Sequence, residues 1–130
     1  MIRRVVVYIL VCVLFLACSA ESDEAKLQQF VVSSVTALHE GDIDTYLQAV
    51  DYGSELDTLH EQLLRQMLSR YVDNVSRFGG LELVEANTCT IKNDSVASVG
   101  YVLMFKDGTR ESRIAQLVRL ADGWKIVEGL

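Results

Sequence analysis

The stretch SVASVGYVLMFKDGTRESRIAQLVRLADGWKIV, residues 95–127, decides the fold of this chain. It consists of three short apolar-rich runs that are joined by KDGT at residues 106–109 and by ADG at residues 121–123. Asp-Gly between alternating hydrophobic residues is a strong hairpin signal, because glycine readily adopts the positive φ of a tight turn. The stretch therefore predicts an antiparallel meander of three strands.

The two turns also predict which side chains share a face of this meander. A two-residue turn at Asp107-Gly108 places one set on a face that we expect to be buried: Phe105, Leu103, Tyr101, Val99, Ala97, Ile114, Gln116, Val118 and Leu120. The wetter face then carries Met104, Val102, Gly100 and Ser98 with Glu111, Arg113, Ala115, Leu117 and Arg119. For the second turn we prefer a three-residue loop with a glycine bulge, which places Trp124 and Ile126 with the buried set.

The composition excludes several classes of partner. The chain has 130 residues, 50% of them hydrophobic, no proline and a formal net charge of -6, which suits one small folded domain. Two of its twelve Lys and Arg residues, Arg3 and Arg4, lie in a segment that we expect to be removed. A nucleic-acid-binding protein needs a basic surface, and an anionic membrane repels an acidic domain. We therefore expect no nucleic-acid partner and a membrane attachment only through a covalent or inserted anchor.

The start of the chain resembles a bacterial lipoprotein signal. A short basic region precedes an apolar run over residues 5–17, which is too short to span about 30 Å of hydrocarbon. The run ends in LFLAC at residues 14–18, which resembles the signal box in which a small residue precedes the lipidated cysteine. The resemblance implies a signal peptide over 1–17, cleavage between Ala17 and Cys18, and attachment to the lipid bilayer through acylated Cys18.

The residues after this cysteine predict where the lipoprotein resides. Ser19 stands where lipoproteins retained in an inner membrane carry aspartate, which favours the outer membrane, facing the periplasm. The acidic residues at 21–24 are interpreted as part of a solvated tether over 18–23, with a surface-export tag as the alternative. An ordinary secretory peptide cut after Ala17 or Ala20, or an uncleaved anchor, also stays open.

From Ser22 onward the apolar residues change to helical spacing. They predict a first helix that Ser22 or Asp23 caps and that ends at Gly41. Asp42 then caps a short second helix, and a third helix begins within residues 54–57. We expect the third helix to pack between the sheet and the first helix, because its apolar arc is wide.

A further strand is predicted over residues 81–92, where imperfect alternation at 85–88 indicates a bulge. It contains Cys89, the one thiol of the mature domain, because Cys12 lies in the leader and Cys18 is the predicted lipid site. A lone cysteine on an apolar strand is typically a small buried hydrophobe. The order of elements predicts an α+β fold, with three N-terminal helices on one face of a four-stranded antiparallel sheet.

This arrangement resembles the nuclear-transport-factor-2-like (NTF2-like) family. The resemblance rests on the helix end over residues 37–42, the short helix that contains Tyr46, and the closing hairpin over 117–126. Within the family it is strongest to small bacterial lipoprotein domains of unknown function, and it covers residues 24–130. It implies a cone between the helices and a curved sheet. The usual long hairpin between the second and third helices has no room here.

Enzymes of this superfamily use Asp, His or Tyr in the cone, and the chain offers His39, His60, Asp42, Asp44, Asp51, Asp57, Tyr46 and Tyr101. General acid–base catalysis needs two such groups within hydrogen-bond reach, and the sequence gives no such pair. Asp42 is better explained as a helix cap, His39 as a last-turn residue favoured by the helix dipole, and His60 as a solvated residue of a first turn. We therefore expect no catalytic residue, no metal and no cofactor.

The sequence instead predicts a binding or interaction module. Val102, Met104 and Leu117 make the wetter sheet face less polar than a solvated face should be. Sheets of this superfamily pair face to face, so these three residues predict a homodimer interface or a docking site for an envelope protein. A carrier of a small apolar ligand in the cone is the alternative, and an isomerase or dehydratase is a weaker one.

Overall fold

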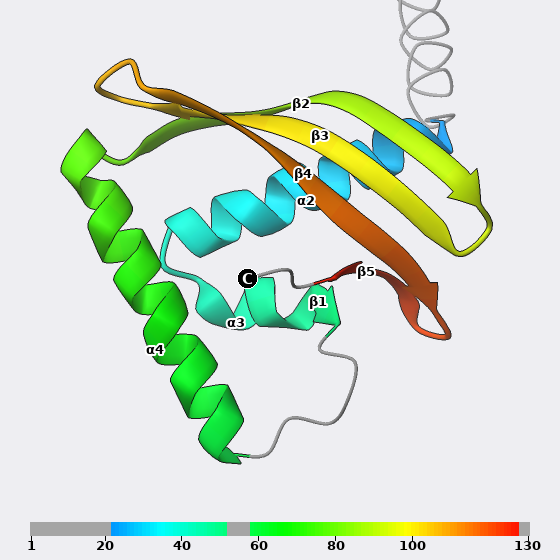
Figure 1. The fold of residues 1–130 in the computed structure, drawn as a ribbon, viewed down its shortest axis with the longest axis horizontal. Helices are drawn as coiled ribbons and strands as arrows, with labels where there is room; N and C mark the ends of the chain where they lie inside the picture. Colours follow the sequence, from blue (N-terminus) through cyan, green and yellow to red (C-terminus); the bar gives the residue numbers. More distant parts are fainter. Residues whose placement is uncertain (1–21, 52–57, 128–130) are drawn as a thin grey trace, which may run out of the picture.

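The computed structural model describes residues 22–51 and 58–127, in which the helices lie under the concave face of a curved sheet (Figure 1). The predicted signal peptide, Ala17, Cys18 and the predicted start of the third helix lie outside these residues. The elements in chain order are α2 (Asp23–His39), α3 (Ile43–Gln48), β1 (Val50–Asp51), α4 (Thr58–Val75), the 3-10 helix η1 (Ser76–Phe78), β2 (Leu81–Asn93), β3 (Val96–Phe105), β4 (Arg110–Leu120) and β5 (Gly123–Val127).

The sheet has five strands in the order β1-β5-β4-β3-β2 and is mixed. β1 runs parallel to β5, with Val50 opposite Ile126, and the Ile126 N–H donates to the Ala49 carbonyl at 2.7 Å. The α+β class is confirmed, but the prediction of four antiparallel strands is wrong. β1 was missed because a two-residue strand is too short to show alternation.

The loop between β3 and β4 has three residues, so the predicted two-residue turn is wrong. The Phe105 N–H donates to the Thr109 carbonyl at 2.9 Å, and Gly108 adopts a φ of 91°. This shift by one residue places Leu103 opposite Glu111 and Ala97 opposite Leu117. The concave face of β4 therefore carries Glu111, Arg113, Ala115, Leu117 and Arg119, which the sequence analysis placed on the other face.

The loop between β4 and β5 also differs from the prediction by one residue. Leu120 pairs with Gly123 across a two-residue loop, and Gly123 has a φ of 124°. Trp124 therefore lies opposite Arg119, and Ile126 opposite Leu117. Trp124 and Ile126 still contact the core as predicted, because the two errors of register cancel.

The ends of α2 follow the sequence signals. The Ser22 side chain accepts a hydrogen bond from the Ala25 N–H, and Gly41 follows the helix with a φ of 87°. Asp42 caps α3 by accepting from the Thr45 N–H. The predicted caps and the predicted glycine stop are thus confirmed.

α2, and not α4, covers the concave face of the sheet, so the predicted packing of the third helix is wrong. α2 contributes Leu27, Val31 and Leu38 to a core that includes Phe105. α4 crosses the end of this layer (Figure 1). Several apolar side chains of α4 stay exposed. Leu59 is 63% exposed, whereas the helix buries Leu68 and Val75.

β2 has the predicted bulge. Ala86 lies opposite Tyr101 and Thr88 opposite Gly100, so Asn87 is the extra residue. After the bulge the alternation resumes with Cys89 opposite Val99, which is fully buried. Cys89 therefore faces the core side of the sheet, where it is half-buried.

Candidate functional site

A pocket of about 190 Å³ lies between the C-terminal end of α2, the middle of α4 and the concave face of β3 and β4. Its floor is apolar and includes Leu38, Leu68 and Leu103. Its polar groups come from five separate elements, α2, α3, α4, β3 and β4: His39, Tyr46, Tyr71, Tyr101 and Arg113. We call this space the cone pocket.

His39 and Tyr71 approach one another across the cone pocket. His39 is in the last turn of α2, and Tyr71 is on α4. The Tyr71 hydroxyl lies 3.4 Å from His39 Nε2, and the two rings meet edge to face with centroids 5.4 Å apart. A distance of 3.4 Å is long for a hydrogen bond, so the pair is loosely held.

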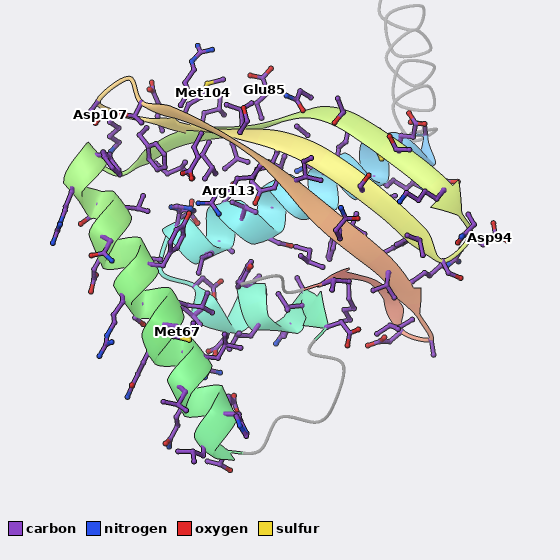
Figure 2. All side chains as sticks on the ribbon, in the orientation of Figure 1. Met67, Glu85, Asp94, Met104, Asp107 and Arg113 are labelled. Atoms are coloured by element: carbon purple, nitrogen blue, oxygen red, sulfur yellow. The ribbon has the colours of Figure 1, made fainter. Side chains whose placement is uncertain are left out.

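Arg113 enters the cone pocket from β4, below the sheet (Figure 2). Its Nη2 donates to the Glu111 carboxylate at 2.6 Å, and its guanidinium carbon lies 5.8 Å from the centre of the Tyr71 ring. Arg113 Nε is buried and has no hydrogen-bond partner among the described residues. A guanidinium is always protonated, so this buried N–H is a donor without an acceptor among the described residues.

The pKa values of both facing groups favour their uncharged forms. Burial, followed by the positive charge of Arg113, lowers the pKa of His39. Burial raises the pKa of the Tyr71 hydroxyl. At neutral pH the pocket therefore presents a neutral imidazole, a neutral phenol and one cation. The predicted benefit of a protonated His39 at the end of the helix is outweighed by this burial.

The structure brings only part of the predicted set into the cone pocket. His39, Tyr46 and Tyr101 line it. Asp42 is a helix cap, as predicted, and Asp44 forms an exposed ion pair with Arg65 at 2.6 Å. Asp51 lies in β1 and does not line this pocket, His60 is exposed in the first turn of α4, and Asp57 is outside the described residues.

Sequence reasoning missed Tyr71 and Arg113. Tyr71 was grouped with the apolar arc of the third helix, and Arg113 was placed on the solvated face by the register error. Glycine at the last position of Lys106-Asp107-Gly108 is a signal for a three-residue loop, because such loops require a positive φ there. That loop length would have placed Arg113 on the concave face.

Two of the three residues predicted to form an interface lie on the convex face of the sheet. Met104 and Glu85 project from it, away from the helices (Figure 2). Val102 and Met104 are half-buried there, but Leu117 is 1% exposed and belongs to the core. The placement of Leu117 on this face is therefore wrong. Its place on the convex face of β4 is taken by Ile114, which is 70% exposed.

The described residues lack two further features. No group of three or more His, Cys, Asp and Glu side chains there is arranged to hold a metal ion. No helix in this part of the chain has both the length and the apolar character needed to cross a membrane.

Comparison with known proteins places the fold. No protein-family model and no curated protein matches the sequence. The structure is similar to that of a protein from Campylobacter jejuni described as an NTF2-like candidate transpeptidase, with a TM-score of 0.65 and 16% sequence identity. The match covers 82% of this chain and 99% of that one. The chain has an NTF2-like fold. At this identity the similarity shows the fold alone.

Proposed function

We propose that this chain is a non-catalytic binding module of a bacterial cell envelope, anchored to the outer membrane through acylated Cys18, whose cone pocket holds a small ligand. The observation that carries the pocket proposal is Arg113, a cation that lines the pocket beside an apolar floor and whose buried Nε–H has no acceptor among the described residues. Such a donor costs about 1–3 kcal/mol unless an acceptor meets it. A ligand with an apolar body and an anionic oxygen supplies that acceptor.

The volume of the cone pocket limits the size of this ligand. About 190 Å³ is below the range of about 300–1,000 Å³ that is typical for drug-sized ligands. At about 30 Å³ per water molecule, it corresponds to roughly six waters. Small carboxylates such as butyrate and benzoate suit both this size and the Arg113 donor.

The transpeptidase activity suggested for the Campylobacter jejuni protein is not part of this proposal. A thiol nucleophile needs a lowered pKa, whereas burial, followed by the charge of Glu24, raises the pKa of Cys89. His39 and Tyr71 lack a close hydrogen bond between them. These observations support binding over catalysis.

Arg113→Met tests the pocket, because methionine keeps an apolar stem and removes every donor. Saturating benzoate or butyrate should raise the melting temperature of the wild-type protein and leave that of the variant unchanged. Arg110→Met is the matched control, since Arg110 is exposed at the start of β4. If neither carboxylate shifts the wild type, or if Arg113→Met responds equally, the pocket proposal fails.

The lipid anchor is tested by Cys18→Ala. Removal of the acylated sulfur should move the protein out of the detergent phase of a membrane extraction, because the remaining acidic domain has no acyl chain to hold it there. Cys12→Ala is the matched control, since Cys12 lies in the predicted leader and should leave lipidation intact. Retention of the Cys18→Ala protein in the detergent phase would contradict the anchor.

Self-association through the convex sheet face is a second candidate function. Four apolar side chains on neighbouring strands favour it: Leu83, Val102, Met104 and Ile114. Leu83 is 51% and Ile114 70% exposed, which is more apolar exposure than a solvated face needs. A second copy is the occupant that we propose for this face.

The charges around this patch suit a two-fold arrangement. Glu85 lies opposite Val102 on one side, and Arg110 lies opposite Met104 on the other. A two-fold axis parallel to β3 lays β2 of one copy over β4 of its partner. Glu85 of each copy then faces Ser112 of the other, the residue that follows Arg110 on the convex face of β4, which supports an isologous contact.

Val102→Glu tests this interface. A carboxylate buried against a facing copy without a counter-charge is costly, so sedimentation should shift toward the monomer while the monomer stays folded. Gln66→Glu, with the same charge on an exposed position of α4 away from this face, is the control. The double variant Glu85→Arg, Arg110→Glu exchanges the charges and should associate like the wild type. If Val102→Glu sediments like the wild type, the convex face is solvated and the self-association proposal fails.

A further inference from the structure

A second cavity, of about 520 Å³, lies at the opposite end of α2 from the cone pocket. Its lining comes from the first turns of α2, from the end of β2 with the β2–β3 turn, and from the β4–β5 hairpin. Asp94, at one of these turns, is far from Asp107 at the other end of the sheet (Figure 2). We call this space the tether cavity, because it adjoins the residues that follow the predicted anchor.

The tether cavity combines an apolar floor with a charged rim. Leu27, Phe30, Ile91 and Trp124 form the floor. Six charged residues surround it: Asp23, Lys26, Asp94, Arg119, Asp122 and Lys125. With three groups of each sign, the rim carries no net formal charge, although the whole chain is acidic.

One ion pair forms within the rim and leaves charges of both signs unpaired. Lys125 is engaged, because its Nζ donates to the Gln48 carbonyl at 2.7 Å and lies 3.5 Å from Asp122. Among the described residues, no ion pair engages Lys26, Arg119 or Asp94. Two cations and one carboxylate thus stay available to a bound molecule of mixed charge.

The length of the tether between Cys18 and α2 limits how far the tether cavity can lie from the membrane. Ser22 caps α2 and is four residues beyond Cys18. Four residues reach at most about 14 Å at 3.3–3.6 Å each. If Cys18 is acylated in the bilayer, the first turn of α2 and the adjoining cavity must lie near the headgroup layer.

We infer that the tether cavity binds the headgroup of a zwitterionic phospholipid of the anchoring membrane; this inference rests on the proposed lipid anchor. Lys26 and Arg119 would meet the phosphate, and Asp94 the ammonium group. Trp124 suits the interface, because tryptophan is enriched where bilayers meet water and its ring attracts cations. The site would hold the domain upright, with the cone pocket directed away from the membrane.

Trp124 makes this inference directly measurable, because it is the one tryptophan of the 130-residue chain. The full-length lipidated protein is reconstituted into vesicles of phosphatidylethanolamine and phosphatidylcholine. A fraction of the lipid carries a doxyl quencher either near the headgroup or near the end of the acyl chain. We expect strong quenching of Trp124 by the shallow label and weak quenching by the deep one.

Charge variants show whether Trp124 is quenched because the cavity binds a headgroup or only because it lies near the membrane. Lys26→Glu with Arg119→Glu should abolish the shallow quenching while the protein still floats with the vesicles. Lys106→Glu is the matched control, because this exposed lysine lies in the β3–β4 turn at the far end of the sheet and should leave quenching unchanged. Vesicles of phosphatidylglycerol alone should quench Trp124 less, since they lack the ammonium group.

The outcomes distinguish the site from the anchor. Equal quenching in the double variant and the wild type, or stronger quenching in phosphatidylglycerol, overturns the headgroup site and leaves the anchor standing. Failure of the wild-type protein to float overturns the anchor and, with it, the membrane-facing orientation. Circular dichroism of each variant should match that of the wild type. Quenching is then lost because the headgroup no longer binds, and not because the variant is unfolded.

Discussion

Leu117 and Ile114 lie three residues apart on β4, but Leu117 is 1% exposed and Ile114 is 70% exposed. The first faces α2 and the core, and the second faces away from every helix. Both are large aliphatic residues, so their chemistry did not decide their burial. The register of one hairpin decided it, because successive side chains of a strand point to opposite faces.

Truncation of these two residues gives the largest contrast between the faces. Leu117→Ala should lower the free energy of unfolding by about 2–5 kcal/mol, as core truncations do. Ile114→Ala should change it by no more than about 0.5 kcal/mol, because the side chain is already solvated. Urea unfolding of the two variants measures both values. A reversed order, with Ile114→Ala the more destabilising variant, would show that β4 has the register predicted from the sequence.

Gly100 lies opposite the bulge of β2, where a larger residue tests the register of β2 against β3. A Cβ at this position would overlap the Thr88 hydroxyl and lie 2.9 Å from Asn87 Oδ1. Gly100→Ala should therefore cost about 1–3 kcal/mol, a typical penalty for overpacking.

The double variant Gly100→Ala, Thr88→Ala removes the overlapping hydroxyl. It should be more stable than the sum of the two single effects predicts, because the residues are in contact. Strict additivity in urea unfolding would place Thr88 away from Gly100 and would contradict the bulge at Asn87.

The smallest effect concerns the two histidines, one at the cone pocket and one in solvent. The pKa of His39 is lowered in the folded state, so the unfolded state binds more protons below about pH 6.5. The stability that His39 contributes as a neutral group should therefore be lost as the pH falls from 6.5 through its folded pKa. His39→Gln should weaken this dependence, measured as melting temperature against pH.

His60→Gln is the matched control, because His60 is exposed in the first turn of α4. Its pH dependence should follow that of the wild type. If His39→Gln shows the full wild-type dependence, the acid sensitivity arises from another group.

Local signals predicted the parts of the fold that depend on neighbouring residues. The Ser22 and Asp42 caps, the glycine stop after α2 and the bulge in β2 were all predicted. Each involves a hydrogen bond or a backbone conformation within a few residues. The α+β class followed from the order of these elements.

The cone pocket was predicted only in part. His39, Tyr46 and Tyr101 were candidates because of their chemistry. Arg113 was assigned to the wrong face, and Tyr71 could not be separated from the other residues of a wide apolar arc. The contact between β1 and β5 was missed, because two residues carry no periodicity.

The sequence by itself determined the caps of α2 and α3, the glycine stop after α2, the bulge in β2 and the α+β class. Only the tertiary structure decided which face of β4 is buried, and with it the places of Arg113 and Leu117. The physical reason is that two-residue and three-residue loops around Asp107-Gly108 are close alternatives locally. The choice between them depends on packing against α2, where one register buries Leu117 and the other would bury Ile114.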